Sequence, residues 1–426
     1  MLGRLRSAAT EGTVAAEQRA HAEMFVEELR DIGFSAGIRQ APGPPIVVGH
    51  DRRSRGPSVL FCGHYGTWSG LSCGKRGSEA ACAESDAAAN SCNADQSTQL
   101  MAFVEACRAW KAVAGQLPIP VSVLVVGERR SGSVRLTSIL RMYADELNTD
   151  IGLAPAVRIS RCAVPTISSM LRGLCREGFT IVAADTDQLA RPRKVAAADP
   201  TRILTRIIGD LQDPPSGRVA MPGFYEDVDA LLRPPHNPQL DAADLPYAPQ
   251  PAQPGSEHGA GLFERIPVWP TCEIESMSGN RYNGGLRPAF VRDAFARLSF
   301  HLVCNQDPEV IRLAFRDFAR ARVPSDCLIE FTPGSSIRPV RFDIGHPAFR
   351  KALDALTIEW GRRAVFVCGD AAPAIQALRE ALGIEIIVMS FPDGNGIGCS
   401  PGETPELANY RLGIRSWARI LDALSH

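Results

Sequence analysis

The feature that most constrains the fold is an alternation of short apolar runs with helix-like segments, which stops in mid-chain and resumes near the end. VLFCG (59–63) and PVSVLVV (120–126) have the composition of buried strands, and each precedes a segment with helical periodicity. The alternation returns from residue 346. In between, residues 177–184 and 297–303 alternate like half-exposed strands. The pattern predicts an α/β domain with a mostly parallel sheet, interrupted by a smaller α/β layer.

The length of the chain agrees with two domains, because 426 residues are too many for one ordinary core. We expect one domain to comprise residues 1–174 and 343–426, with an inserted domain at 175–342. A hydrophobic content of 45% and a charged content of 22% fit a soluble globular protein. The formal net charge of −1 provides no overall basic field for nucleic acid.

The cysteines and the N-terminal segment indicate in which cellular compartment the protein is expected. Twelve cysteines are scattered without CxxC pairs, which in a long chain is typical of reduced thiols and not of a disulfide framework. The segment MLGRLRSAATEGTVAAEQ lacks the apolar core of a signal peptide, and no apolar run is long enough to span a membrane. We therefore expect a cytoplasmic protein that binds neither membrane nor nucleic acid.

The segment VVGERRSGS (125–133) lies between an expected strand and an expected helix, where α/β proteins commonly place active-site residues. It carries Glu128, Arg129 and Arg130 in succession. Adjacent arginines are usually solvated or paired with nearby carboxylates, here Glu128 or Asp95. The residues alone leave open whether this pair is structural or functional.

Six segments, taken in chain order, carry a resemblance to a known family. They are PSVLFCGHYGTW, NADQSTQLMAFVEA, VVGERRSGS, GRVAMPGFYEDV, RPAFVRDAFARLSFHLVCNQDPEVI and FPDGNGIGCSPGE. These segments resemble motifs of the M20 family of dinuclear zinc peptidases, in its dipeptidase and carboxypeptidase branch, and they extend over nearly the whole chain. The resemblance implies a zinc-peptidase-like α/β fold, with a mixed sheet flanked by helices and an inserted α+β lid that usually forms a dimer.

The resemblance also implies which residues occupy the family's catalytic positions. Hydrolysis in that family needs two zinc ions, their ligands and a carboxylate base. His64 and Asp95 match two ligand positions, whereas Gly66 stands where a carboxylate orients the histidine. Arg129 falls on the catalytic glutamate and Arg130 on the next ligand glutamate.

The remaining ligand positions have changed as well. The ligand aspartate falls near Ala156, and the last ligand histidine falls on Cys399 or Ile397. Arginine stays protonated under ordinary conditions, so its repulsion of Zn²⁺ persists at any working pH. We expect no metal, no other cofactor and no dinuclear zinc hydrolysis. A single-metal site of His64, Asp95 and Cys399 is the alternative, and the arginine pair opposes it electrostatically.

The lid motifs imply a changed substrate. The family's lid histidine has no counterpart in LARPRKVAA (189–197). His301 stands where the lid arginine is expected, Asn283 matches the lid asparagine, and Asp370 occupies a position where serine is usual. The candidate substrate-binding residues are Arg129, Arg130, Tyr65, Asn283, His301, Asp370 and Cys399.

Structural roles are the alternative for three candidates. His64 could be a retained histidine at a strand end, and Asp95 could cap the following helix, because aspartate is a favoured N-cap. Cys399 could be an inert small hydrophobe.

The arginine pair predicts chemistry on an oxyanion. Guanidinium groups bind sulfate, phosphate or carboxylate in a bidentate way and stabilise charge that develops on a leaving group. His64 or Asp95 would act as the base that takes a proton from an attacking amine. This combination predicts a metal-free elimination or substitution in which an amine displaces sulfate or phosphate, including ring closure within one molecule.

The resemblance extends to peptidase-like proteins of natural-product pathways. It implies an amino-acid-derived substrate, either free or held on an acidic carrier protein, and aziridine formation by loss of sulfate. Two other classes remain open: a non-catalytic pseudopeptidase subunit that supports a partner chain, and an anion or amino-acid binding protein. The retained His64, Asp95 and glycine-rich loops favour an enzyme. We expect a dimer through the lid, and the sequence leaves open whether it is a homodimer or a heterodimer.

Overall fold

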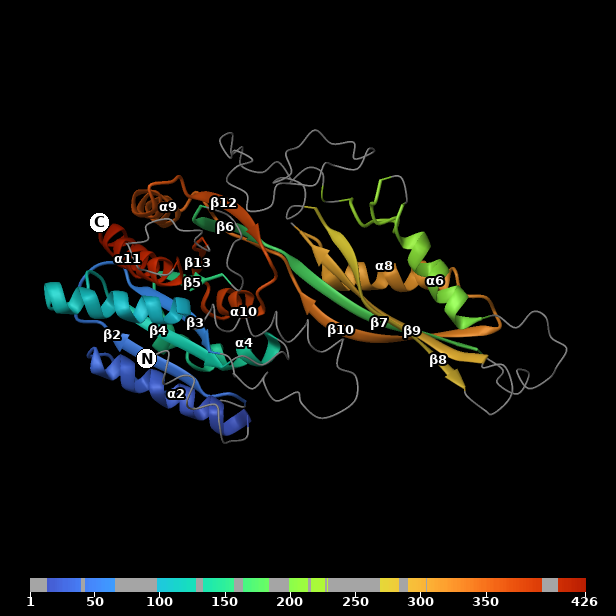
Figure 1. Ribbon diagram of the computed structural model, residues 1–426, viewed down its shortest axis with the longest axis horizontal. Helices are drawn as coiled ribbons and strands as arrows, with labels where there is room; N and C mark the ends of the chain where they lie inside the picture. Colours follow the sequence, from blue (N-terminus) through green and yellow to red (C-terminus); the bar gives the residue numbers. More distant parts are fainter. Residues whose placement is uncertain are drawn as a thin grey trace. The chain divides into compact units, whose positions relative to one another are not determined.

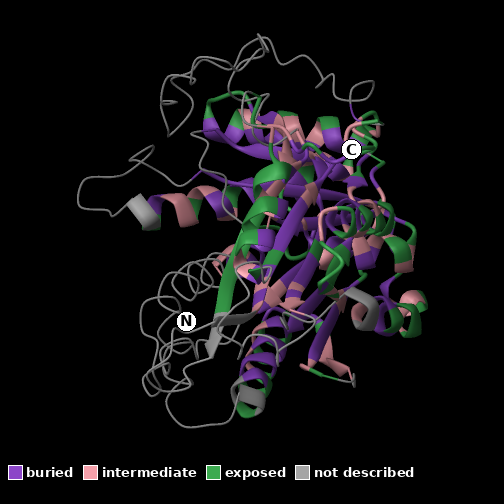
Figure 2. Cartoon of the chain, turned by 90° about the vertical axis from the view of Figure 1, so that its right-hand side faces the viewer, coloured by how far each residue is buried: buried purple, intermediate pink, exposed green. Residues whose placement is uncertain are grey.

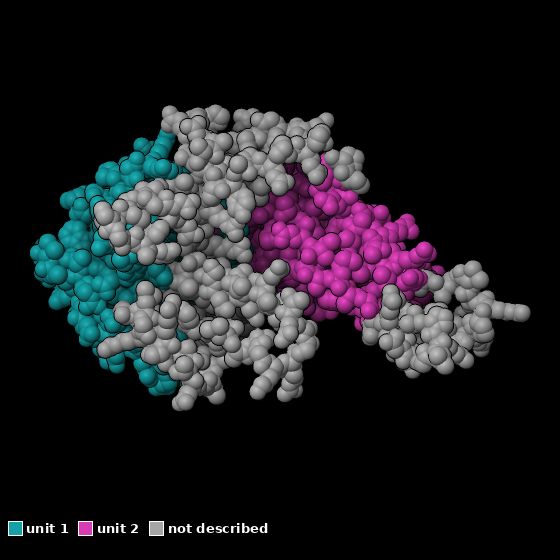
Figure 3. Space-filling view, in the orientation of Figure 1, with its two compact units in different colours: residues 1–169, 237–248, 342–426 teal, residues 170–236, 249–341 magenta. Residues whose placement is uncertain are grey.

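The chain divides into two compact units (Figure 3). The computed structural model describes residues 14–39, 43–65, 98–127, 133–156, 164–183, 199–213, 216–226, 228, 269–282, 290–303, 305–392 and 405–426. Among these, the first unit comprises the residues up to Ser169 and those from Phe342 onward, and the second comprises those from Met170 to Arg341. The sequence placed the corresponding junctions after residues 174 and 342.

A nine-stranded mixed sheet forms the centre of the first unit, and its last strand, β11, and the last two residues of β6 fall in the second unit (Figure 1). Its strands follow the order β1-β2-β4-β3-β5-β13-β6-β11, and β12 also pairs with β6. The strands are β1 (Ser35–Arg39), β2 (Ile46–Asp51), β3 (Val59–Tyr65), β4 (Val121–Gly127), β5 (Ile151–Pro155), β6 (Thr166–Leu171), β11 (Val340–Arg341), β12 (Val365–Gly369) and β13 (Glu385–Ser390). The helices are α2 (Val14–Asp31), residues 98–114, α4 (Ser133–Met142), α5 (Ala144–Leu147), α9 (Pro347–Trp360), α10 (Pro373–Leu382) and α11 (Pro405–Ser425).

Parallel pairing holds only in the middle of this sheet. β4, β3, β5 and β13 pair in parallel, whereas β1, β2, β6 and β11 join by antiparallel pairings. The mixed α/β sheet is confirmed, but the expectation of a mostly parallel sheet is wrong at both sides. All of β4 and all but one residue of β3 are buried. Figure 2 shows buried residues in purple along many of the strands. Continuous apolar runs are typical of such parallel strands, which helices cover on both faces.

The two faces of the sheet carry different helices. Adjacent residues of a strand point to opposite faces. On β2, a side chain at Gly49 would meet Leu29 of α2, with 3.1 Å between the added Cβ and Leu29 Cδ1. The next residue, His50, lies with its Nε2 3.1 Å from Glu146 Oε1 of α5. α2 and α5 therefore cover opposite faces.

An aromatic cluster fixes two further helices on the α2 face. Phe61 of β3 stacks on Phe103 of the helix at 98–114, with ring centroids 3.8 Å apart. Trp417 of α11 meets these two rings edge-on at 5.2 and 5.6 Å. Phe61 pairs with Val123, which pairs with Gly49, so all three side-chain positions belong to one face of the sheet.

The second unit is a four-stranded antiparallel sheet with two helices. Its strand order is β10-β7-β9-β8. The elements are β7 (Gly173–Ala183), α6 (Pro200–Leu211), β8 (Thr271–Tyr282), β9 (Phe290–Leu302), α8 (Pro308–Arg320) and β10 (Cys327–Ile337). Each helix begins with an aspartate cap followed by proline: Asp199 accepts a hydrogen bond from Thr201 N, and Asp307 accepts one from Glu309 N.

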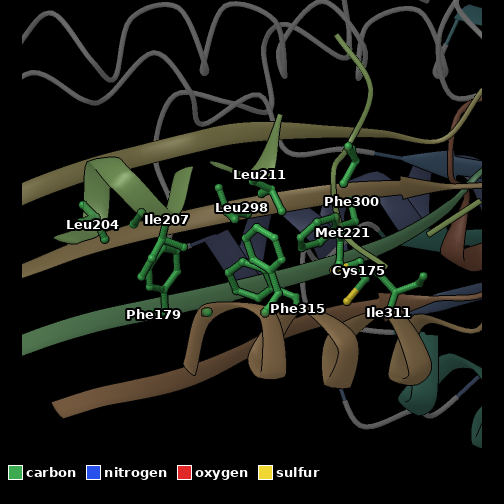
Figure 4. Packing of buried hydrophobic residues seen from close by; sticks show 14 of the residues in the cluster. Cys175, Phe179, Leu204, Ile207, Leu211, Met221, Leu298, Phe300, Ile311 and Phe315 are labelled. Carbon is green, nitrogen blue, oxygen red and sulfur yellow. The ribbon is translucent and has the colours of Figure 1, made fainter. Parts of the chain in front are cut away.

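Phenylalanine rings form the centre of the second unit's core (Figure 4). Phe315 of α8 lies 5.4 Å from Phe179 of β7 and 5.4 Å from Phe300 of β9, measured between ring centroids. Leu204 and Ile207 of α6 belong to the same buried cluster. The helices thus cover one face of the antiparallel sheet. Within the described ranges of the whole chain, no helix has the length and apolar character that crossing a membrane requires.

A polar cluster ties β1 and β2 to α5 in the first unit. Glu146 accepts a hydrogen bond from Arg39 Nε at 3.0 Å and lies 3.1 Å from His50 Nε2. Ser122 Oγ lies 2.9 Å from His50 Nδ1 on the other side of the ring. The hydrogen bond from Arg39, followed by that of His50, lowers the pKa of Glu146 to about 2.

We predict that Glu146→Gln destabilises the first unit at pH 7 and flattens its acid response. A carboxyl group whose pKa is depressed in the folded state stabilises that state above its unfolded pKa of about 4.5, and this contribution is lost as the pH falls toward 2. The expected loss at pH 7 is roughly 2 kcal/mol. Denaturant unfolding at pH 7, 4 and 3 measures it.

Glu23→Gln is the matched control, because Glu23 pairs only with exposed Arg19 on α2 and should change stability little. Equal stability losses for the two variants at pH 7, or unchanged acid sensitivity in Glu146→Gln, would contradict the assignment.

Candidate active site

The candidate site lies at the edge of the sheet where four parallel strands end. β4, β3, β5 and β13 pair in parallel, so their carboxyl ends share one edge. The last residues of these strands are Tyr65, Gly127, Pro155 and Ser390. Open α/β sheets commonly bind ligands at this edge.

Of the two predicted bases, His64 is the one that the structure describes. It is the penultimate residue of β3, pairs with Val126 of β4 and is half-buried. Burial lowers the pKa of His64 to about 4. The imidazole is therefore neutral near pH 7 and has a free lone pair with which it can accept a proton. The other predicted base, Asp95, lies outside the described residues.

Tyr65 has a structural position at the end of β3. Its ring packs against His21 and Phe25 of α2, with centroids 6.4 and 6.1 Å away, and only 2% of the residue is exposed. Its hydroxyl donates a hydrogen bond to the carbonyl of Pro45. Burial raises the pKa of this phenol above its usual range. The predicted contact between Tyr65 and a substrate gains no support from this arrangement.

Gly127, the last residue of β4, allows the close approach of Tyr65. A Cβ at position 127 would lie 2.8 Å from Tyr65 Oη and closer still to Pro44 Cβ. Glycine is required there because any side chain would displace one of these neighbours. This contact fixes the end of β4, and in the sequence Gly127 is followed by Glu128 and the two arginines. Sequence reasoning missed Gly127, although glycine directly after an apolar run is a signal of close backbone approach.

Ala156 follows β5, and the family resemblance places a ligand aspartate near it. Its N–H donates a hydrogen bond of 2.8 Å to the carbonyl of Met389. The pairing of β3 with β5 ends at Phe61 and Leu153, three residues before His64 and Ala156. The side chain of Ala156 is a methyl group and supplies no ligand for a zinc ion.

Asp370 lies apart from this strand end within the first unit, and His301 belongs to the second unit. Asp370 is exposed and follows β12, which pairs with β6. β12 is four strand positions from β3, which is on the order of 19 Å across the sheet. His301 belongs to β9 of the second unit, where it is half-buried with its Nε2 3.4 Å from Glu273 Oε2.

The other predicted site residues, Asp95, Arg129, Arg130, Asn283 and Cys399, lie outside the described residues. Within the described part of the chain, no three His, Cys, Asp or Glu side chains are grouped so that they could hold a metal ion.

Solved structures identify the fold, whereas no family model matches the sequence. The M20 family metallo-carboxypeptidase Sso-CP2 from Sulfolobus solfataricus is 17% identical, with a TM-score of 0.69 and coverage of 99% of each chain. Human carnosine dipeptidase 1 is 15% identical, with a TM-score of 0.71 and coverage of 100% of this chain and 95% of that one. The dipeptidase Dug1p from Saccharomyces cerevisiae is 17% identical, with a TM-score of 0.71 and the same coverage.

This chain has the M20 metallopeptidase fold. The expected zinc-peptidase-like architecture is confirmed over the length of the chain, with a large mixed sheet flanked by helices. Identities of 15–17% establish the fold alone. The chemistry must be argued from this chain's own residues.

We predict that Gly127→Ala destabilises the first unit by about 1–3 kcal/mol, because the added methyl group overpacks against Tyr65 and Pro44. Gly209→Ala is the matched control in α6, where a Cβ meets nothing within 4 Å. Alanine has the higher helix propensity, so this variant should gain about 0.5–1 kcal/mol. Denaturant unfolding of both variants measures the difference. A Gly127→Ala protein as stable as the wild type would show that the approach of Tyr65 does not require glycine.

Proposed function

We propose that this protein is a metal-independent enzyme of secondary metabolism that acts on an amino-acid-derived substrate. In this proposal Arg129 and Arg130 bind an anionic leaving group, sulfate or phosphate, during elimination or intramolecular cyclisation. One observation carries it: Gly127 pairs with Tyr65 at the end of β3, and the two arginines follow Gly127 by two and three residues. This sequence position supports the proposal that the two arginines act at this edge, where the family resemblance implies carboxylates.

The charge at this edge favours anions over divalent cations. Arginine remains protonated, and two guanidinium groups repel Zn²⁺ at any working pH. The side chain of Ala156, after β5, supplies no oxygen, and Gly66 supplies no carboxylate to orient the histidine. A guanidinium group presents its N–H donors in a planar fork that matches sulfate, phosphate or carboxylate. The reaction is therefore assigned to bound oxyanions and involves no metal step.

The reaction balances as an internal displacement. The substrate amine attacks the carbon that carries the sulfate or phosphate ester, a C–N bond forms, and the C–O bond breaks. The leaving oxyanion departs with the bonding electron pair and is stabilised by Arg129 and Arg130. A base takes the proton from the amine nitrogen. When amine and ester lie on adjacent carbons, the product is an aziridine.

His64 and Asp95 are the two candidates for the base. The neutral imidazole of His64 can accept the proton directly, and its low pKa makes it a weak base that releases the proton readily. Asp95 follows the same strand further along the chain and would accept the proton as a carboxylate. Asn283, His301, Asp370 and Cys399 are proposed as further substrate contacts.

Similarity to dipeptidases and a carboxypeptidase supports an amino-acid-derived substrate. We propose that this substrate is held on an acidic carrier protein and that the enzyme acts in the cytoplasm. We also propose a dimer through the second unit, because β8 is an edge strand of its sheet and exposes Ile274 (50%) and Met277 (45%). An edge strand offers unpaired backbone groups to a second chain.

The test measures binding of inorganic sulfate and phosphate by calorimetry at constant ionic strength. We expect Arg129→Ala and Arg130→Ala each to weaken binding by about tenfold or more, since a hydrogen bond to a charged group contributes about 1.5–3 kcal/mol. Arg19→Ala is the matched control, because Arg19 is exposed and its ion pair among the described residues is with Glu23 on the same helix. If both active-site variants bound sulfate and phosphate as the wild type does, the proposal would fail.

A further inference from the structure

Arg218, in the inserted unit, lies over two aromatic rings. Its guanidinium carbon lies 4.2 Å from the ring centroid of Tyr225 and 5.4 Å from that of Trp269. The two rings are 6.3 Å apart. Arg218 is half-buried, so part of its charge is removed from water. Its guanidinium group carries five N–H donors, and no hydrogen bond from them to another described residue accompanies the contacts with the rings.

A tight hairpin holds Arg218 in place. Its carbonyl accepts a hydrogen bond of 2.8 Å from Asp213 N, and Gln212 and Val219 form a β-bridge across the turn. Gly217, at a φ of 66°, supplies the left-handed residue of that turn. The backbone next to the guanidinium is therefore ordered before any ligand binds.

The ring of Tyr225 and the backbone of Trp269 are held by contacts that do not involve the side chain of Arg218. Tyr225 accepts a hydrogen bond of 3.0 Å from Val219 N through its hydroxyl oxygen, and it packs edge-on against Phe224 at 5.0 Å. The Trp269 carbonyl accepts a hydrogen bond of 2.7 Å from Arg172 Nη2. Groups that are already held in place cost less ordering entropy when a ligand binds.

Most of the other arginines that lie over aromatic rings also pair with a carboxylate, which Arg218 lacks among the described residues. Four of them also pair with a carboxylate: Arg316 with Glu177 at 2.6 Å, Arg320 with Asp317 at 3.1 Å, Arg322 with Asp210 at 3.0 Å and Arg379 with Glu385 at 2.5 Å. Arg297 has no such pair among the described residues, but it is exposed and lies over one ring at 5.7 Å. Among the described residues Arg218 alone combines two rings, partial burial and no carboxylate or hydrogen-bond acceptor for its guanidinium group. A half-buried charge without a counterion is costly, so an external anion is the natural partner.

We propose that Arg218, Tyr225 and Trp269 form an anion-binding site in the inserted unit, separate from the site at the ends of the parallel strands. The site would bind an oxyanion that matches the guanidinium fork, such as a sulfate, phosphoryl or carboxylate group. It does not depend on the function proposed for Arg129 and Arg130.

The experiment follows tryptophan fluorescence while sodium sulfate, sodium phosphate or sodium acetate is added to the full chain at constant ionic strength. Trp269 is in contact with Arg218, so an anion at the site should change its emission in a saturable way. Preference for the tetrahedral ions over acetate, or the reverse, identifies the kind of group. Arg218→Ala should weaken binding by about tenfold or more, and Arg218→Lys by less, because lysine keeps the charge but loses the fork.

Two further variants assign the signal. Trp269→Phe should abolish the fluorescence change while calorimetry still detects the anion. The double variant Arg129→Ala/Arg130→Ala should keep the fluorescence change, which distinguishes this site from the one proposed above. The inference is overturned if Arg218→Ala and Arg218→Lys both bind the anions as the wild type does, or if sodium chloride produces the same saturable change.

Discussion

The parallel hydrogen-bonded pairing of β4, β3, β5 and β13 is the constraint on which the rest of the structure depends. It brings four strand ends to one edge of the sheet, although their last residues are spread from Tyr65 to Ser390 in the sequence. The pairing of Tyr65 with Gly127 then fixes where the segment that begins with Glu128 leaves the sheet. Helices on both faces bury these strands, so their register cannot shift without exposing apolar side chains.

The charge placed at that edge decides the chemistry that the fold can support. The same strand ends could present carboxylates for metal ions, but this sequence follows β4 with two arginines and β5 with an alanine. In the proposed function, two guanidinium groups that pH does not neutralise take the place of divalent cations. The neutral imidazole of His64 would accept the proton from an amine. The fold is that of M20 metallopeptidases, and we propose that its site prefers oxyanions to metal ions.

Much of the fold could be predicted from periodicity, and the failures have physical causes. α8 (Pro308–Arg320) carries two local signals that a sequence displays, an Asp-Pro start and an amphipathic pattern. β8 (271–282) was missed because an edge strand that is largely exposed has no apolar alternation. At the site, the order of motifs predicted which strands matter. The burial of Tyr65 and the stacking of Arg218 on Trp269 depend on contacts between distant segments, which local patterns do not encode.

The most direct test of this account is the zinc content of the purified protein. The chain is equilibrated with excess zinc, the free ion is removed, and the bound metal is determined by elemental analysis. The account predicts no bound zinc, because Arg129 and Arg130 repel it and Ala156 offers no ligand. Two zinc ions per chain would contradict the account and would assign the protein to ordinary dinuclear peptidase chemistry.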